Sequence, residues 1–206
     1  MNQYRVARPL SLPPVVKNLL IINGLAFMGQ MVMYELLVRW FGLMPLAGGF
    51  LPWQLVTYAF LHGSLTHLFF NMFALWMFGV QIESTWGSRR FAFFYFVCVI
   101  GAALMQLATN PSVPTIGASG GIFGILAAFG MLFPNQRIML LFPPIPIPAK
   151  YFVIGYGVLE FFFVASGGQP GVANLAHLGG MVVGVLLILY WRGKLPFKPQ
   201  RRTPFF

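Results

Sequence analysis

The sequence predicts an all-α integral membrane protein, folded as a single bundle of six transmembrane helices. Its 206 residues are 58% hydrophobic and only 8% charged, and the mean hydropathy is +0.78. Six apolar runs nearly fill the chain, and a spanning helix needs roughly 20 such residues. These runs are continuous, whereas the strands of a membrane barrel alternate apolar and polar residues, so helices are expected.

The distribution of basic residues predicts the topology. The formal net charge is +10, and nearly all Lys and Arg fall near the two ends or in every second loop; Arg39 is the exception. By the positive-inside rule both termini are expected in the cytoplasm, most simply at a bacterial inner membrane. Basic tails at 1–17 and 192–206 then flank a membrane domain at 18–191, and they are expected to contact anionic lipid and not nucleic acid.

The first helix is expected at residues 18–37, with Asn23, Gln30 and Glu35 facing the bundle because unpaired polar groups facing lipid are costly. A long outer loop follows at residues 38–65. It is unusually rich in aromatic and aliphatic residues, which predicts that it lies partly in the membrane surface with its tryptophans at headgroup level.

The second helix is expected at residues 66–84 and the third at 90–109. His67 and Asn71 lie one turn apart on one face of the second helix, near its outer end. The only cysteine, Cys98, lies in the apolar third helix and is expected to be a small buried hydrophobe.

The fourth helix is expected at residues 119–133, before Pro134. Fifteen residues at 1.5 Å each reach only about 22 Å, against a hydrocarbon core of about 30 Å. This helix cannot span the membrane. If its inner end is fixed near Pro134, then Ser119 at its outer end is recessed below the surface.

A proline-rich stretch at 134–149 is expected to be a stiff inner linker. The fifth helix follows at 150–166, with Glu160 near mid-depth and no evident partner. The loop at 167–171 has the composition of a hinge. The sixth helix, at 174–191, begins at the outer side with His177, and Gly180 and Gly184 share its face.

Ser119 lies among glycines, where a nucleophile could meet a target backbone closely. Taken alone, this pattern also fits tight helix packing. Topology, however, places Ser119, His177, His67 and Asn71 together in the outer half of the bundle. The expectation is a Ser119–His177 dyad whose ring is held by packing against Phe123, with no carboxylate beside it. His67, Asn71 and the free N–H groups of the fourth helix would bind an oxyanion.

The residues as a set resemble the rhomboid intramembrane serine proteases. The resemblance rests on His67-x-x-x-Asn71, on Gly117-Ala118-Ser119-Gly120 and on Ala176-His177 with Gly180 and Gly184, over roughly residues 50–190. It implies Ser119 as nucleophile, His177 as general base, and His67 with Asn71 as oxyanion donors. It also implies structural roles for His62 and for Glu83 with Gly87, and a gate position at Phe70.

Two positions depart from the family pattern. Gln54 follows Trp53 where the family often has arginine, and Phe123 stands where tyrosine is frequent. Neither change removes a catalytic group. The expected activity is therefore cleavage of transmembrane protein substrates near their outer ends, with no cofactor and no metal; the oligomeric state is not predicted.

Three other kinds of protein are compatible with parts of this sequence. A transporter could use the broken fourth helix as a binding site, but the two halves show no inverted repeat. A metal site from His62, His67 and His177 is disfavoured, because His62 and His67 do not share a helical face and no H-E-x-x-H motif is present. A non-proteolytic rhomboid-like binder of membrane proteins would be favoured by loss of the serine or the histidine, and both are present.

Overall fold

The computed structural model describes residues 12–109, 112–140, 143–167 and 173–196. Most of both expected basic tails and of the expected hinge at 167–171 lies outside these residues. The helices are α1 (Pro14–Phe41), η1 (Leu46–Gly48), α2 (Gln54–Thr57), η2 (Tyr58–Phe60), α3 (Leu65–Ala74), η3 (Leu75–Gly79), α4 (Val80–Trp86), α5 (Ser88–Thr109), α6 (Ser119–Leu132), α7 (Ala149–Ala165) and α8 (Asn174–Trp191). The strands are β1 (Arg137–Met139) and β2 (Pro146–Pro148).

Within the described ranges, the expected six-helix membrane bundle is confirmed. The second helix is continuous through α3, the π-helical turn η3 and α4. Four helices are long and apolar enough to cross a membrane: α1, α3 through α4, α5 and α8. The central helix α6 has only 14 residues, about 21 Å at 1.5 Å per residue, so it is too short to span the hydrocarbon core.

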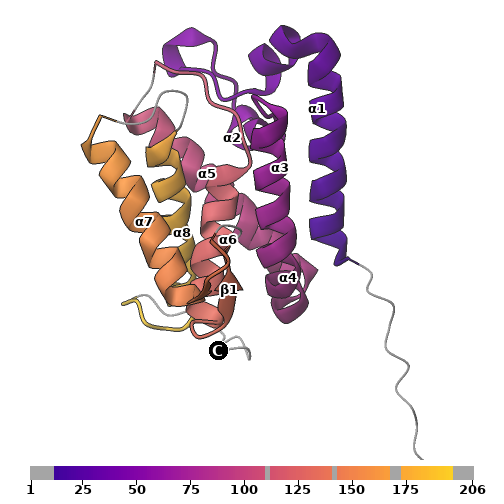
Figure 1. Cartoon of the computed structure of the whole chain (residues 1–206). Helices are drawn as coiled ribbons and strands as arrows, with labels where there is room; N and C mark the ends of the chain where they lie inside the picture. Colours follow the sequence, from indigo (N-terminus) through magenta and orange to yellow (C-terminus); the bar gives the residue numbers. More distant parts are fainter. Residues whose placement is uncertain (1–11, 110–111, 141–142, 168–172, 197–206) are drawn as a thin grey trace, which may run out of the picture.

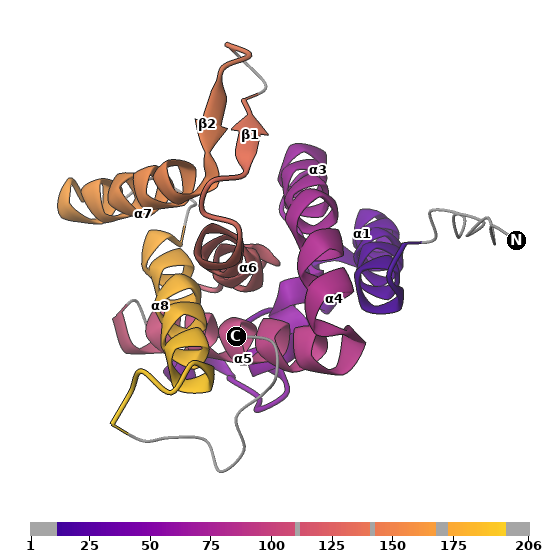
Figure 2. The same cartoon turned by 90° about the horizontal axis from the view of Figure 1, so that it is seen from below.

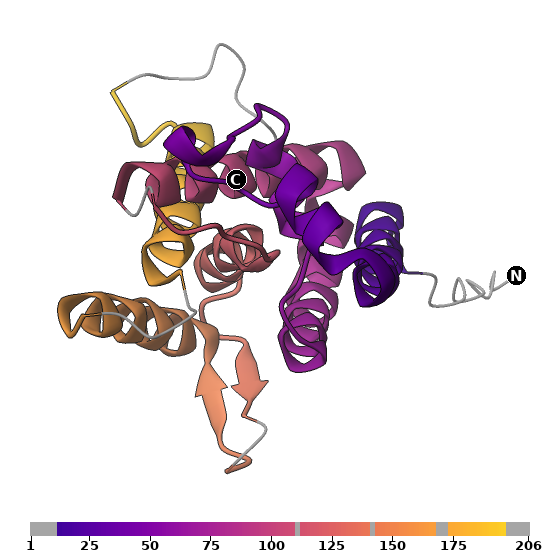
Figure 3. The same ribbon diagram turned by 90° about the horizontal axis from the view of Figure 1, so that it is seen from above.

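The short helix α6 forms the centre of the bundle. It packs against α3, α5, α7 and α8, and the views along the bundle show it enclosed between α7 and α8 on one side and α3 on the other (Figures 2 and 3). Every residue from Gly120 to Gly130 is buried. The chain before α6 descends from the upper end of the bundle before the helix begins (Figure 1), so Ser119 is recessed as expected.

Glycine allows α6 and α8 to approach backbone to backbone. A Cβ added at Gly180 would overlap the carbonyl oxygen of Gly120, and one added at Gly184 would lie 3.1 Å from the Cα of Gly124. Small residues at these positions remove the side-chain layer that normally separates two helices. The first turns of α6 and α8 are therefore held side by side, which brings their polar residues within hydrogen-bonding range.

The inner connection between α6 and α7 is a hairpin and not the expected simple linker. Strands β1 and β2 pair antiparallel, with Ile138 opposite Ile147. Proline is tolerated in such a two-stranded ribbon because each strand has an open edge that requires no N–H donor. The hairpin projects sideways from the bundle at the end opposite Ser119 (Figures 1 and 2).

Glu83 ties the second helix to the start of α1. Its two carboxylate oxygens accept hydrogen bonds from the backbone N–H groups of Val15 and Val16, at 2.9 and 2.8 Å, and Ser88 Oγ donates to it at 2.7 Å. The first N–H groups of a helix have no partner within it, and a carboxylate there also meets the positive end of the helix dipole. Gly87 ends α4 at a φ of +80°.

The outer loop is organised around Gln54. This side chain is fully buried, and its Oε1 accepts from the N–H groups of Met44 and Leu51, both at 3.1 Å. Its Nε2 donates to the carbonyls of Arg39 and Trp40 at 3.2 and 3.3 Å. Glutamine suits this place because it is both donor and acceptor, whereas arginine offers donors only.

Candidate active site

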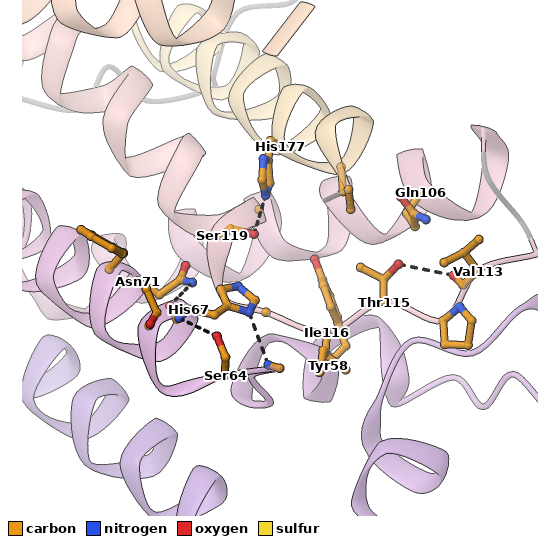
Figure 4. Close-up of a pocket in the computed structure, with 18 of the residues that line it drawn as sticks. Tyr58, Ser64, His67, Asn71, Gln106, Val113, Thr115, Ile116, Ser119 and His177 are labelled. Atoms are coloured by element: carbon orange, nitrogen blue, oxygen red, sulfur yellow. Dashed lines mark hydrogen bonds between the residues drawn. The ribbon is translucent and has the colours of Figure 1, made fainter. Parts of the chain in front are cut away.

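The serine and histidine predicted from the sequence lie in direct contact. Ser119 begins α6 and His177 lies in the first turn of α8, and the distance from Ser119 Oγ to His177 Nε2 is 2.7 Å (Figure 4). Gly117, with a φ of +134°, turns the chain into α6 in a conformation that side-chain-bearing residues rarely adopt. Its N–H donates to the carbonyl of Tyr58 at 2.9 Å, which fixes the turn that presents Ser119.

Phe123 holds the imidazole from one side. It lies one turn after Ser119, and its ring stacks on that of His177 with centroids 4.4 Å apart and planes 8° from parallel. This contact limits rotation of the ring. The spacing of one helical turn between Ser119 and Phe123 already predicts this packing.

The expectation that no carboxylate meets the imidazole is wrong. Glu160 Oε1 lies 3.0 Å from His177 Nδ1, and Asn174 Nδ2 donates to Glu160 Oε2 at 2.7 Å. Glu160 lies within two turns of the end of α7, and His177 lies in the first turn of α8. Because these antiparallel helices are joined by a short connection, the two side chains reach the same depth as the recessed serine.

The partners of His177 determine its tautomer. A carboxylate that accepts at both oxygens can only be paired with donors, so Nδ1 of His177 carries the proton. Nε2 is then the acceptor for the Ser119 hydroxyl. This assignment from the hydrogen-bond network gives the imidazole the form that a general base requires.

His67 and Asn71 lie on α3 at the other side of the serine. The N–H of Gly63 points to His67 Nδ1 at 3.4 Å, which leaves Nε2–H as a donor. A Cβ built on Gly117 would lie 2.9 Å from His67 Nε2 and 3.6 Å from Ser119 Oγ, so the His67 imidazole lies near the Ser119 hydroxyl. Asn71 Nδ2 donates to the carbonyl of His67 at 2.8 Å, and both residues line the same pocket as Ser119.

His62 lies between Gln30 of α1 and the ring of His67. Its backbone exchanges two hydrogen bonds with the side chain of Gln30 on α1, at 2.9 and 3.2 Å. The ring is buried, packs edge-on against His67 at 4.9 Å, and has no hydrogen-bond partner at either nitrogen among the described residues. Burial, and to a lesser degree the nearby His67, lowers the pKa of His62 to about 3, so its ring is neutral.

One cavity of about 850 Å³ at the upper end of the bundle is lined by Ser119, His177, His67 and Asn71. Its walls come from α3, from the segment before α6 and from the start of α8 (Figure 4). The first N–H groups of α6 open toward it, and no side chain caps that helix. Phe70 lines the cavity and is 54% exposed. A cavity of this size can admit an extended peptide segment.

Glu160 and Asn174 are the site residues whose roles sequence reasoning missed. Both are visible as polar residues in apolar helices, and an ionisable residue at membrane depth is itself a signal of function. Their partnership depends on how α7 rotates against α8. Helical spacing within one element does not contain that information.

The fold and the site define a class: a polytopic helical membrane protein with a serine–histidine pair recessed inside the bundle. Residues 50–194 match the family model of the Rhomboid domain. The chain belongs to the rhomboid family, which confirms the resemblance seen in the sequence.

Curated relatives share this domain. The chain is 32% identical over 158 residues to Rhomboid protein 1, mitochondrial, of Saccharomyces cerevisiae, covering 70% of this chain and 43% of that protein. It is 35% identical to Rhomboid protease GluP of Bacillus subtilis, covering 64% and 24%, and 31% identical to Rhomboid protease AarA of Providencia stuartii, covering 66% and 54%. The matches thus span about half or less of the length of these relatives.

Proposed function

We propose that this protein is an intramembrane serine endopeptidase that cleaves transmembrane segments of membrane-protein substrates near the end of the bundle where Ser119 lies. The observation that carries the proposal is the 2.7 Å contact between Ser119 Oγ and Nε2 of His177. Two relatives bear the name rhomboid protease, which supports the same reaction class.

In the proposed reaction, Ser119 Oγ attacks the scissile carbonyl carbon while its proton passes to His177 Nε2. The electron pair of the carbonyl moves to its oxygen, which His67 Nε2–H, Asn71 and the first N–H groups of α6 stabilise. Collapse of this intermediate breaks the C–N bond, and the leaving amine takes the proton from Nε2. Water then hydrolyses the acyl-enzyme by the same route.

The substrate must be extended at the cleaved bond. In a helix the scissile carbonyl accepts a hydrogen bond from a residue four positions on, and the surrounding turns shield it. The polar groups of the cavity beside α3 can form hydrogen bonds with the backbone N–H and C=O groups that become unpaired when the substrate helix unwinds. Substrates with helix-weakening residues near the cleaved bond are therefore favoured, as the family resemblance also suggests.

The proposal includes an orientation. The end of the bundle opposite Ser119 contains the starts of α1 and α7, the junction of α4 and α5, β1 and the end of α8 (Figure 1). These segments carry the basic residues Lys17, Lys150, Arg89, Arg137 and Arg192. By the positive-inside rule this end faces the cytoplasm. The active site then opens to the non-cytoplasmic side, and the bacterial relatives support a bacterial inner membrane as its location.

Cleavage in proteoliposomes tests the proposal. The purified chain is reconstituted with a quenched fluorescent peptide long enough to span the bilayer, and cleavage is followed by fluorescence and mass spectrometry. Ser119→Ala and His177→Ala are expected to abolish cleavage, and Ser84→Ala, at an exposed serine on α4, to leave it unchanged. Cleavage that persists in Ser119→Ala contradicts the proposal, and solute flux without cleavage would favour the transporter class.

A further inference from the structure

We propose that Glu160 is a positioning residue for His177, so that the working unit is a Ser119–His177–Glu160 triad and not a dyad held by packing alone. This inference rests on the proposed function and adds a third group to it. Its basis is the 3.0 Å contact from Glu160 Oε1 to His177 Nδ1, between side chains that are only 11% and 13% exposed.

Glu160 is itself held in place. Its second oxygen, Oε2, accepts from Asn174 Nδ2 at 2.7 Å, so one carboxylate bridges two residues that lie one turn apart on α8. Both ends of this arrangement are directional hydrogen bonds to a charged acceptor, which are shorter and stronger than neutral ones. The carboxylate therefore has a single orientation toward the imidazole.

The apolar surroundings of the Glu160 carboxylate argue against an incidental contact with His177. The neighbours of Glu160 along α7 are Val158, Leu159, Phe161 and Phe162, all exposed on the apolar surface of the helix. An ionised carboxylate in such surroundings is costly unless it is paired and hydrogen-bonded. The pairing with Asn174 and His177 offsets that cost, and the charge is retained where it acts on the general base.

The chemical consequence concerns the proton transfer. When Ser119 Oγ attacks, its proton passes to Nε2 and the ring becomes an imidazolium that still carries its proton on Nδ1. Glu160 stabilises this cation and remains deprotonated throughout. It also fixes the tautomer, since the alternative form would place a lone pair of Nδ1 against a carboxylate oxygen.

The chain provides its own controls, because its three acidic residues are all glutamates in different settings. Glu160 contacts His177; Glu83 accepts backbone N–H groups at the start of α1; Glu35 lies on α1 outside the catalytic cavity. At each of the three positions, the change to glutamine replaces one carboxylate oxygen with an NH2 group and removes the negative charge. They separate an effect on the imidazole from a general effect of removing a carboxylate.

The test measures inactivation of the full chain in detergent by a fluorophosphonate probe. In this reaction the Oγ–P bond forms, the P–F bond breaks, and the serine proton passes to Nε2. The limiting rate kinact reports the chemical step, and the half-saturating probe concentration KI reports binding. Glu160→Gln is expected to lower kinact by about 10-fold or more with KI unchanged, since the base loses its orienting charge.

Glu160→Ala is expected to lower kinact further, because Nδ1 then has no acceptor. Glu35→Gln should match the parent in both constants and in its unfolding midpoint. Glu83→Gln should lower the unfolding midpoint and leave kinact of the folded protein unchanged. A folded Glu160→Gln protein with the kinact of the parent overturns the inference.

If Glu160→Gln does not fold, histidine nitrogen NMR of the parent tests the same claim. The inference requires the His177 ring, assigned by comparison with His177→Ala, to carry its proton on Nδ1; a ring protonated on Nε2 alone overturns it. The two proposals fail separately. Absence of Ser119-dependent labelling in the parent defeats the proposed function, whereas normal labelling that is indifferent to Glu160 defeats only this inference.

Discussion

At the scale of single residues, the polar side chains around Ser119 come from three different helices. Ser119 comes from α6, His177 from α8 and His67 from α3. The hydrogen bond of each imidazole to a second group sets its tautomer: Nε2 of His177 accepts, and Nε2 of His67 donates. In the proposed mechanism, these different neighbours assign one imidazole the role of base and the other that of oxyanion donor.

The first prediction concerns His67. Replacing it with alanine removes an N–H donor from the side of the serine while leaving the contact of Ser119 with His177 intact. We expect kcat for peptide cleavage to fall by about 10²–10³-fold with little change in KM, as is usual for loss of an oxyanion donor. Asn71→Ala should show the same pattern. A kcat equal to that of the parent would assign both residues to structure alone.

A second prediction concerns Gln54. Gln54→Ala removes the acceptor of the Met44 and Leu51 N–H groups and a donor to the Arg39 carbonyl, and a buried polar group left without a partner costs about 1–3 kcal/mol. We expect a clear drop in the thermal unfolding midpoint in detergent. The matched control is Gln81→Ala, because Gln81 makes an exposed pair with Gln136. If both variants unfold at the same temperature, Gln54 is not the organising residue of the loop.

Some positions of single residues in the site could be predicted from the sequence, and others could not. Ser119, His177, His67 and Asn71 could be placed together because each lies at a helix end whose side of the membrane follows from topology. Glu160 could not, since its contact with His177 depends on how α7 is rotated against α8. Gln54 could be seen as a departure from the family pattern, but its four hydrogen bonds depend on how the loop folds.

At the scale of elements, the short helix α6 is the decisive feature. Its length could be predicted from Ser119 and Pro134, and its near-complete burial follows from its position at the centre of the bundle, in contact with α3, α5, α7 and α8 among others. Two features escaped prediction. The π-helical turn η3 (Leu75–Gly79) interrupts an otherwise regular apolar pattern, and the pairing of Ile138 with Ile147 converts a proline-rich stretch into a hairpin.

The third prediction tests the approach of α8 to α6. Gly180→Ala places a methyl group on the carbonyl of Gly120, and overpacking of this kind typically costs about 1–3 kcal/mol. We expect α8 to shift outward, so that both the unfolding midpoint and kcat fall. Gly155→Ala, at an open position on α7 with no atom within 4 Å, should be neutral or stabilising. Equal behaviour of the two variants would refute close packing as the means of joining serine and histidine.

At the scale of the whole molecule, the side of the membrane from which substrate reaches Ser119 depends on which end of the bundle faces the cytoplasm. The basic segments and the cavity occupy opposite ends of the bundle. If the basic end faces the cytoplasm, as the positive-inside rule predicts, the cavity opens to the other side of the membrane. Both ends can be probed with the same substitution, because Ser112 and Ser84 are exposed at opposite ends and Cys98 is buried.

The fourth prediction uses these two serines. In intact cells, Ser112→Cys is expected to react with a membrane-impermeant maleimide, whereas Ser84→Cys should react only after the cells are opened. The parent, with buried Cys98 alone, serves as the background. Labelling of Ser84→Cys from outside would invert the topology and place the site at the cytoplasmic face.

The most direct measurement of the central claim is the site of covalent modification. The parent protein, treated in detergent with a fluorophosphonate probe and digested, is expected to carry the phosphonate on Ser119 as read by mass spectrometry. Ser119→Ala should carry none, and His177→Ala should react far more slowly. Modification of another serine, or a rate at Ser119 that is unchanged in His177→Ala, would contradict a histidine-activated serine within the bundle.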